Sequence, residues 1–411
     1  MSEVRDISLA PSGENKIKWA SRNMPVLNSI AEDFKKTKPL SGLRVALSVH
    51  MEAKTAYLCR VMALGGAEMH VTGCNPLSTQ DDVAAAVAAG GIDVHAYHAA
   101  TQEEYVRHLC AVLECEPNII IDDGGDLLEL MHTKYTHLIP NVIGGCEETT
   151  TGIHRLRAMA KAKELRFPMM MVNEADCKHL FDNRYGTGQS VWDGINRTTN
   201  LIVAGKTVVI AGYGWCGRGT AMRAKGMGAR VVITEIDPIK AIEASMDGFD
   251  LMPMREAAAI GDIFITVTGC KDVICAEHFA LMKDGAIMCN AGHFNVEINL
   301  DELAELAEKR YEARQNIEGF VCKDGRTLFV LAEGRLVNLA SGDGHPAEIM
   351  DMSFSIQALS AKYLADNRGK LPKDVIAVPA EIDHEVAERK LRSMGKSIDV
   401  LSEQQREYLG V

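Results

Sequence analysis

The sequence predicts an α/β fold made of two doubly wound parallel-sheet domains, one of them inserted into the other. Three observations lead to this prediction. The 411 residues are enough for two or three separate hydrophobic cores. From residue 43 onward, short β-rich apolar runs alternate with helical patterns. Two segments rich in small residues, 182-DNRYGTGQS-190 and 341-SGDGHPAEIM-350, flank the second series of runs as hinges would.

Six strands are expected in the first domain. Their apolar runs are nearly continuous, which is typical of parallel strands covered by helices on both faces. Stretches such as 81-DDVAAAVAAG-90 and 102-QEEYVRHLCAVLE-114 lie between them and have helical spacing. The expected strands are 43–49, 67–73, 92–97, 117–122, 141–145 and 167–172.

The second domain carries a dinucleotide-binding fingerprint. Its first strand runs into Gly212-x-Gly214-x-x-Gly217 and then a helical pattern, and such glycines let the backbone approach a pyrophosphate. The next strand ends in Glu235, at the distance expected for an acid that binds ribose hydroxyls. Glu235, with Asp237 nearby, would repel a ribose phosphate, so we predict NAD as the cofactor. The expected strands are 207–212, 230–235, 262–269, 286–292 and 328–333.

The two hinges define the expected domain boundaries. The helix over about 347–367 should pack back on the first sheet, so the substrate-binding domain is expected to be 1–185 and 346–375. The NAD-binding Rossmann domain would be 186–345. The remaining segment, 376–411, has helical periodicity over much of its length and is expected to be a C-terminal tail that contacts other subunits.

Composition and charge argue against several classes of partner. Against 56 Asp and Glu there are 44 Lys and Arg, which gives a net charge of −12 without a long basic run, so we expect no nucleic acid and no membrane partner. No hydrophobic signal region or bilayer-length apolar run is present in the sequence. The 11 cysteines are scattered without zinc-ligand spacing, which indicates reduced thiols and no metal site. We therefore expect a cytoplasmic protein that acts on a small molecule.

Polar residues follow the expected strands of the first domain. In open α/β sheets, ligands bind outside the carboxyl ends of the strands. Any one such residue is typical of a helix cap or a turn, but together they indicate a site that faces the NAD-binding domain. They are His50; Asn75 with Thr79 and Gln80; Asp122 and Asp123; Glu147, Glu148 and Thr149; and Asn173.

Four further residues are expected at the same cleft. Lys178 and Asp182 are four residues apart, so on a helix they share a face. That helix should begin at the rim and end at the first hinge, where a simple surface ion pair would be a coincidence. His293 follows a strand of the NAD-binding domain, and His345 marks the second hinge.

Together with these residues, the chain has eight motifs that, in their order, resemble the S-adenosylhomocysteine hydrolase family. The resemblance extends from about Trp19 to Leu409, which is nearly the whole chain. The motifs are 78-STQDD-82, 121-IDDGGD-126, 146-CEETTTG-152, 181-FDNRYG-186, 210-IAGYG-214, 234-TEIDP-238, 290-NAGHF-294 and 332-AEGRLVNL-339.

The resemblance implies reversible hydrolysis of S-adenosyl-L-homocysteine to adenosine and L-homocysteine. In this family NAD oxidises the ribose 3′-hydroxyl to a ketone, which acidifies the 4′ C–H so that the 5′ thiol is eliminated. Water then adds, and the stored hydride reduces the ketone, so tightly bound NAD is recycled. The hinges should close to exclude water during the ketone stage. A homotetramer or homodimer is expected.

The resemblance also assigns roles by position. Lys178, oriented by Asp182, would take the 3′-hydroxyl proton, and burial is expected to favour loss of its own proton. The order in which Asp123 and His50 act at the 4′ carbon and the 5′ sulfur stays open. The expected catalytic residues are His50, Asp123, Glu148, Lys178, Asp182 and His293. The expected substrate contacts are Glu52, Lys54, Thr55, Gln80, Thr149 and His345. The expected NAD contacts are Thr149, Thr150, Thr151, Asn183, Gly212, Gly214, Trp215, Cys216, Gly217, Glu235, Thr266, Thr268, Gly292, His293 and Asn338.

The chain departs from the family pattern at three places. Many relatives have a Thr and a Glu that meet the purine where this sequence has Glu52 and Lys54. Asp343 occupies a position that is often Met. The chain stops at Val411, before the tail with which longer relatives reach a neighbouring subunit's NAD. Because a lysine ammonium only donates hydrogen bonds, Lys54 would match the six-position carbonyl of hypoxanthine, so S-inosyl-L-homocysteine is the alternative substrate.

Two other functions fit the sequence less well. NAD-dependent dehydrogenases of 2-hydroxy acids share an inserted nucleotide domain, but they lack the helix with Lys178, Asp182 and Asn183. An NAD-binding regulator without catalysis would not need the intact set of acids and bases at the rim.

Overall fold

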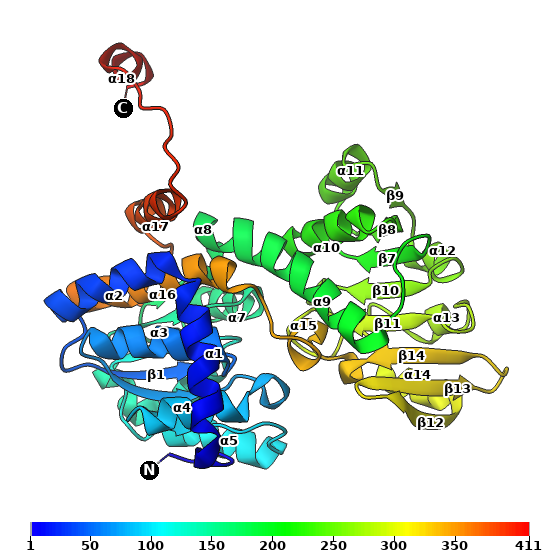
Figure 1. The fold of residues 1–411 in the computed structure, drawn as a ribbon, viewed down its shortest axis with the longest axis horizontal. Helices are drawn as coiled ribbons and strands as arrows, with labels where there is room; N and C mark the ends of the chain where they lie inside the picture. The colour runs from blue at the N-terminus through cyan, green and yellow to red at the C-terminus, as the bar shows by residue number, and fades with distance from the viewer. Residues whose placement is uncertain (1, 411) are drawn as a thin grey trace.

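Seven parallel strands form the sheet of the first lobe, which comprises residues 2–178 and 347–393 of the computed structural model (Figure 1). The structure describes residues 2–410. The inner strands are apolar and buried, as a sheet covered on both faces requires. In spatial order the strands are β15 (Val375–Ile376), β6 (Met169–Met170), β5 (Gly144–Glu147), β4 (Ile119–Asp122), β1 (Arg44–Ser48), β2 (Glu68–Thr72) and β3 (Asp93–His95).

Helices cover both faces of this sheet, as Figure 1 shows. The longer ones are α1 (Ala10–Arg22), α2 (Pro25–Thr37), α3 (Ala53–Leu64), α4 (Asp81–Ala89), α5 (Gln102–Leu113), α6 (Asp126–Thr133), α7 (Thr150–Lys161), α16 (Ala347–Asp366) and α17 (Ala380–Ser393). The short ones are η1 (Ile7–Leu9), η2 (Pro76–Ser78), η3 (Thr136–Asn141), η4 (Val172–Glu174) and α8 (Asp176–Lys178). The fifth strand was predicted to begin at residue 141, but η3 occupies that position and β5 begins at Gly144.

The second lobe, residues 187–340, has a mixed sheet of eight strands. Its strands, in spatial order, are β12 (Ala307–Arg314), β13 (Ile317–Cys322), β14 (Thr327–Leu331), β11 (Ile287–Asn290), β10 (Ile263–Thr266), β7 (Thr207–Ala211), β8 (Arg230–Thr234) and β9 (Asp250–Leu251). Its helices are α9 (Thr187–Thr199), α10 (Trp215–Gly226), α11 (Pro238–Met246), α12 (Met254–Ala258), α13 (Ala276–Phe279), α14 (Leu300–Leu306), η6 (Ala332–Gly334) and α15 (Val337–Ala340).

The predicted all-parallel sheet is wrong for one edge of the second lobe. β12, β13 and β14 pair antiparallel, whereas β14 pairs parallel with β11. No sequence pattern predicts β12, because this edge strand, AEKRYEAR, exposes nearly all its residues and has no apolar alternation. The fold class itself, two doubly wound domains with the second inserted in the first, is confirmed.

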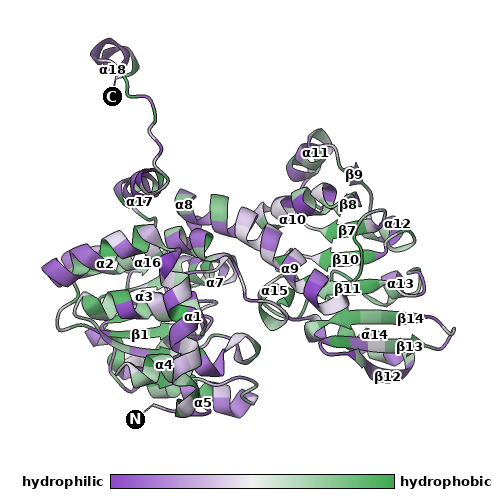
Figure 2. Ribbon diagram, in the orientation of Figure 1, coloured by the Kyte–Doolittle hydropathy of each residue, from purple (hydrophilic) through white to green (hydrophobic). Residues whose placement is uncertain are grey.

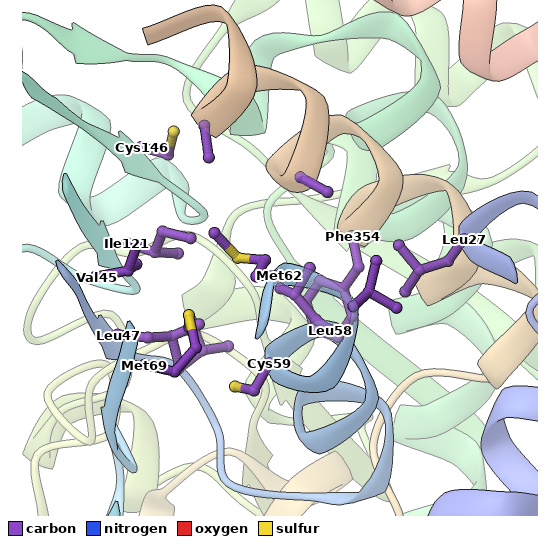
Figure 3. Packing of buried hydrophobic residues seen from close by; sticks show 14 of the residues in the cluster. Leu27, Val45, Leu47, Leu58, Cys59, Met62, Met69, Ile121, Cys146 and Phe354 are labelled. Atoms are coloured by element: carbon purple, nitrogen blue, oxygen red, sulfur yellow. The ribbon is translucent and has the colours of Figure 1, made fainter. Parts of the chain in front are cut away.

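The insertion is visible in the return of the chain after the second lobe. α16 packs on α2, α3, α8 and β5, all of which belong to the first lobe. Its Phe354 lies in the same apolar cluster as Leu58 and Met62 of α3 and Leu27 of α2 (Figure 3). The first lobe is therefore closed by residues from both ends of the chain.

The segment between Asn173 and the second lobe is not one regular helix as predicted. It consists of η4, α8 and η5 (His179–Gly186), a π-helix that continues directly into α9. π-helical turns are rare and often lie at functional sites. Lys178 and Asp182 nevertheless stay close, with 3.4 Å between Nζ and Oδ2.

The C-terminal segment divides into two parts. α17 packs on α2 and α16, while α18 (Glu403–Leu409) lies away from both lobes (Figure 1). The hydropathy colouring shows apolar strands inside both lobes and a mixed surface on α18 (Figure 2). Within residues 2–410, no helix is both long enough and apolar enough to cross a membrane.

Candidate active site

A cavity of about 1480 Å³ lies between the lobes, and residues of both lobes line it. Its walls come from the carboxyl ends of β1, β4 and β5 on one side and of β7, β8, β10 and β11 on the other. This is the position at which open parallel sheets bind ligands. Among the polar residues expected at the strand ends, Asn75, Thr79, Asp122 and Glu147 do not line the cavity. The expected catalytic, substrate and NAD contacts all line it except Gln80, Gly217 and Thr266.

These three residues have other roles in the structure. The Gln80 side-chain oxygen accepts a hydrogen bond from Lys16 Nζ at 3.1 Å. The buried Thr266 hydroxyl donates to Asn290 Oδ1 at 3.1 Å. A Cβ at Gly217 would lie 2.1 Å from the Gly212 carbonyl oxygen, so Gly217 allows α10 to pack against the turn before it. Gln80, Gly217 and Thr266 therefore support the structure around the cavity and do not line it.

Lys178 is the centre of a buried polar cluster. Its Nζ donates hydrogen bonds to Asn173 Oδ1 at 3.0 Å and to Asn183 Oδ1 at 2.9 Å. The same Nζ lies 3.4 Å from a carboxylate oxygen of Glu148 and 3.4 Å from one of Asp182. Lys178 therefore has a fixed direction and two acidic neighbours inside the cavity wall.

The charge state of Lys178 differs from the one the sequence suggested. Burial lowers the pKa of Lys178, but the Asp182 and Glu148 carboxylates outweigh burial, and its net pKa is raised. Burial acts in the predicted direction, toward loss of the proton, but the prediction left out the combined charge of the two carboxylates, which outweighs it. Burial in turn raises the pKa of Glu148 to about 7, against the opposing effect of Lys178. Protonation of Glu148 would therefore remove one of the two charges that hold the Lys178 proton.

Helix α16 and the second hinge orient the two acids. Ser353 Oγ donates to Asp182 Oδ2 at 2.7 Å, and His345 Nδ1 hydrogen-bonds the other Asp182 oxygen. Although burial opposes it, the Lys178 and His345 charges bring the pKa of Asp182 below its usual range. Gln357 donates to Glu148 Oε2 at 2.5 Å. Asp182 is therefore the ionised partner of Lys178, whereas Glu148 can titrate.

Sequence reasoning missed Ser353 and Gln357. They are four residues apart, so they lie on one face of α16, a helix whose middle is fully buried. Polar residues at helical spacing inside an otherwise apolar buried helix are a usable signal, since buried polar groups need partners.

A second cluster surrounds His50. The Nδ1 atom of His50 lies 2.6 Å from Ser78 Oγ, and its Nε2 atom lies 3.6 Å from Asp123 Oδ2. The buried Cys74 thiol donates to Asp123 Oδ2 at 3.2 Å. The side-chain atoms of His50, Cys74 and Asp123 that face one another all lie within 4.8 Å. Burial lowers the pKa of His50 to about 4, so the ring is neutral at pH 7.

His293 brings the second lobe to this cluster. Its ring centroid lies 6.2 Å from that of His50. A Cβ at Gly124, which has φ of +107°, would lie 2.6 Å from His293 Nε2, so only glycine permits this approach. The two lobes therefore meet beside the acid–base residues.

Lys54 and Glu52 lie in the cavity wall at the start of α3. Glu52 caps this helix by accepting from the Lys54 and Thr55 backbone N–H groups. Lys54 Nζ lies 2.8 Å from Glu52 Oε2 and donates to the Asp343 carbonyl oxygen at 2.9 Å. Both side chains are buried, so the ammonium connects the first lobe to the second hinge.

The opposite wall fits a dinucleotide. Gly212 has φ of +101°, and nothing lies within 4 Å of a Cβ built on Gly214, so the turn before α10 leaves open space for a pyrophosphate. Glu235 lies in the cavity wall at the end of β8 and accepts from the backbone N–H of Tyr213 at 2.7 Å. The buried Asn338 Oδ1 has no hydrogen-bond partner among the described residues. A carboxamide N–H of nicotinamide would satisfy it.

The cofactor wall and the polar clusters that face it together define a class of protein. It is an NAD-dependent enzyme in which a cofactor wall on one domain faces a buried lysine, histidine and carboxylate cluster on the other. Residues 183–344 match the family description "S-adenosyl-L-homocysteine hydrolase, NAD binding domain", and residues 1–134 match "S-adenosyl-L-homocysteine hydrolase".

Curated relatives agree with these matches over the full chain. The chain is 58% identical over 409 residues to an S-inosyl-L-homocysteine hydrolase of Methanococcus maripaludis, covering 100% of this chain and 98% of the relative. It is 56% identical over 406 residues to an adenosylhomocysteinase of Thermococcus kodakarensis, covering 99% and 96%. It is 55% identical over 408 residues to an adenosylhomocysteinase of Aquifex aeolicus, covering 99% and 98%. The chain belongs to the S-adenosyl-L-homocysteine hydrolase family.

Proposed function

We propose that this protein catalyses the reversible hydrolysis of S-adenosyl-L-homocysteine to adenosine and L-homocysteine, with NAD tightly bound. The observation that carries the proposal is the Lys178 cluster. The buried Lys178 ammonium is held in place by hydrogen bonds and lies between Asp182 and Glu148. It is in the wall of a cavity whose other side fits NAD. Such a cluster suits oxidation of a sugar hydroxyl, which needs a proton acceptor beside a hydride acceptor.

The proposed site and domains are those expected from the sequence. The catalytic residues are His50, Asp123, Glu148, Lys178, Asp182 and His293. The expected substrate-binding domain is 1–185 with 346–375, and the expected NAD-binding domain is 186–345. The expected tail is 376–411, of which α17 packs on the first lobe and α18 lies away from it. We propose that the tail contacts another subunit, so light scattering on the purified protein should give the mass of a dimer or tetramer. A monomer at working concentration would contradict this assignment.

Lys178 has the role of moving the proton of the ribose 3′-hydroxyl. Its hydrogen bonds to Asn173 and Asn183 fix Nζ, so that a substrate oxygen can replace one carboxylate contact. Lys178 is an ammonium in this structure, so it must lose a proton before it can accept one. Protonation of Glu148 would weaken the field that retains that proton.

NAD, when bound, supplies reversible hydride acceptance from the ribose carbon. Gly212 and Gly214 would hold its pyrophosphate, Glu235 its ribose hydroxyls and Asn338 its carboxamide. Thr268, whose hydroxyl donates to the buried Glu297 at 2.6 Å, would support the nicotinamide side.

His50 and Asp123 have the role of proton transfer at the 4′ carbon and the 5′ sulfur. His50 is neutral, so it can accept a proton, and its contact with Ser78 fixes the ring so that Nε2 faces Asp123. His293 covers this pair from the second lobe and helps to exclude water while the sugar is oxidised.

The direct test is to incubate the purified protein with S-adenosyl-L-homocysteine and a thiol reagent without added NAD. We expect release of free homocysteine, and NAD in the supernatant after denaturation of fresh protein. Absence of a thiol product with both the adenosyl and the inosyl substrate, from NAD-loaded protein, would favour the regulator. Net accumulation of NADH with a 2-hydroxy acid would favour the dehydrogenase.

A second candidate substrate, S-inosyl-L-homocysteine, is favoured by the placement of Lys54. The Lys54 ammonium is buried in the cavity wall, where it can donate to a hypoxanthine carbonyl while Glu52 accepts from the adjacent ring N–H. An adenine amine against Lys54 would instead leave two donors facing each other, a mismatch that can reach a factor on the order of 10⁴ in specificity.

The two substrates are separated by the ratio of their kcat/KM values in the wild type and in Lys54→Glu. If Lys54 reads hypoxanthine, the wild type prefers the inosyl substrate and Lys54→Glu moves the ratio toward the adenosyl substrate. Equal values in the wild type, or a ratio that the substitution leaves unchanged, would remove Lys54 from base recognition. Lys18→Glu is a matched control on the exposed surface.

A further inference from the structure

Beneath the proposed catalytic residues lies a pair of carboxyl groups, Asp122 and Glu147, that the mechanism above does not use. They end the neighbouring parallel strands β4 and β5 and are partners in register, so their side chains lie on the same face of the sheet. Both are completely buried. Each directly precedes a proposed catalytic residue, Asp123 in one strand and Glu148 in the other.

The pair binds the backbone on both sides of Asp123 and Glu148. Asp122 accepts hydrogen bonds from the Asp123 N–H at 3.2 Å and, through its other oxygen, from the Leu128 N–H at 2.8 Å. Glu147 Oε1 accepts from the backbone N–H groups of Gly124 and Thr149, each at 2.9 Å. Glu147 therefore links the two loops that carry Asp123 and Glu148.

No cation balances the pair. Among the described residues, neither Asp122 nor Glu147 has a Lys, Arg or His within ion-pair distance, and the Arg155 guanidinium reaches Asp126 instead. Two buried carboxylates side by side without a counter-ion cannot both be ionised at moderate cost. Burial raises the pKa of Asp122 to about 7 and, together with the Asp122 charge, raises that of Glu147 well above its usual range.

The two carboxyl groups differ in how their oxygens accept hydrogen bonds. Both oxygens of Asp122 accept from backbone N–H groups, so a proton on either oxygen would weaken one of these bonds. Only Oε1 of Glu147 accepts, from the Gly124 and Thr149 N–H groups and from the Thr149 hydroxyl at 2.9 Å, whereas Oε2 is buried without a partner and is free to hold a proton. A Cβ on residue 152 would lie 2.1 Å from the Glu147 carboxyl carbon, so Gly152 lets the group lie flat against α7. An unpartnered O–H costs far less there than an unpartnered charge.

We propose that Glu147 is a neutral, protonated positioning residue that, with ionised Asp122, fixes the geometry of Asp123 and Glu148 for catalysis. Neither group lines the cavity. The proposal predicts an asymmetry between two isosteric variants. In Glu147→Gln the amide oxygen replaces Oε1 and the NH₂ replaces the O–H, whereas in Asp122→Asn the NH₂ must face a backbone N–H.

The kinetic test, which rests on the proposed function, compares these variants with Glu147→Met as holoenzymes. We expect Glu147→Gln to keep kcat within about threefold, and Asp122→Asn and Glu147→Met to lose about 10- to 100-fold in kcat with KM changed far less. NAD content and melting temperature report whether each variant folds. Tolerance of Asp122→Asn with loss in Glu147→Gln would overturn the assignment of the proton, and full activity in all three would overturn the positioning role.

A spectroscopic test stands apart from the proposed function. In the infrared difference spectrum of wild type minus Glu147→Gln at pH 7, we expect the C=O band of a protonated carboxyl group. A carboxylate band in its place would overturn the proposal even if the enzyme acted on another substrate.

Discussion

The two walls of the cavity are built from different chemistry. The wall of the first lobe contains charged and titratable side chains, centred on Lys178, that hydrogen-bond one another in a buried network. The wall of the second lobe combines glycines such as Gly212 and Gly214 with many apolar side chains, and it also contains Asn338 and charged residues such as Glu235. One wall can move protons, and the other can hold a cofactor by its shape.

This difference predicts that substitutions in the two walls should have different effects. A change in the first wall should abolish chemistry and leave NAD bound, because the network does not hold the cofactor. A change in the second wall should weaken NAD binding without disturbing the proton-transfer groups. Measurements on variants of each wall can test this division.

The largest effect is expected from Lys178→Met. Removing the proton acceptor should slow reduction of bound NAD by substrate at least about 1000-fold, within the range that acid–base catalysis contributes. Stopped-flow absorbance of NADH measures this step, and denaturation followed by chromatography measures bound NAD, which should be unchanged. A normal NADH burst in the variant would break the comparison, and Lys18→Met is the exposed control.

A smaller effect is expected from Gly214→Ala in the cofactor wall. The added methyl meets no protein atom within 4 Å, so it points into the space proposed for the pyrophosphate. The Kd for NAD should rise about 10- to 100-fold, equal to about 1.4–2.7 kcal/mol, while the melting temperature without NAD stays the same. Gly226→Ala, also open at its Cβ and in the same helix α10, is the matched control. Unchanged NAD affinity would contradict the assignment of this wall.

The smallest effect is a pH dependence that arises in the first wall. Burial lowers the pKa of His50 to about 4 from an ordinary value of 6.5, so the unfolded chain binds this proton more readily than the folded one. The His50 contribution to stability is therefore fully present above pH 6.5 and is lost as the pH falls from 6.5 toward 4.

Nuclear magnetic resonance of histidine ring protons can measure this titration, with His50→Gln used to assign the signal. His50 should remain neutral down to about pH 4. A midpoint near 6.5 would mean that the cluster is open to water and that the two walls differ less than the structure indicates.

The sequence by itself determined the fold class, the cofactor and most of the cavity residues. Parallel strands need continuous apolar runs, and a dinucleotide turn needs glycines at fixed spacing, so both leave local patterns. It missed β12, whose exposed charged residues carry no such pattern, and the short, partly buried β13 that pairs with it. It also placed a regular helix where η5 is a π-helix, because the choice between the two depends on what packs around it.

Only the tertiary structure decided the charge states and the supporting contacts. The Lys178 proton is retained because Glu148, 30 residues away in sequence, adds its charge to that of Asp182. Ser353 and Gln357 reach the same cluster because α16 returns to the first lobe after the inserted domain. Electrostatic fields and hydrogen-bond partners depend on distances in space, and those distances exist only when remote segments of the chain have packed together.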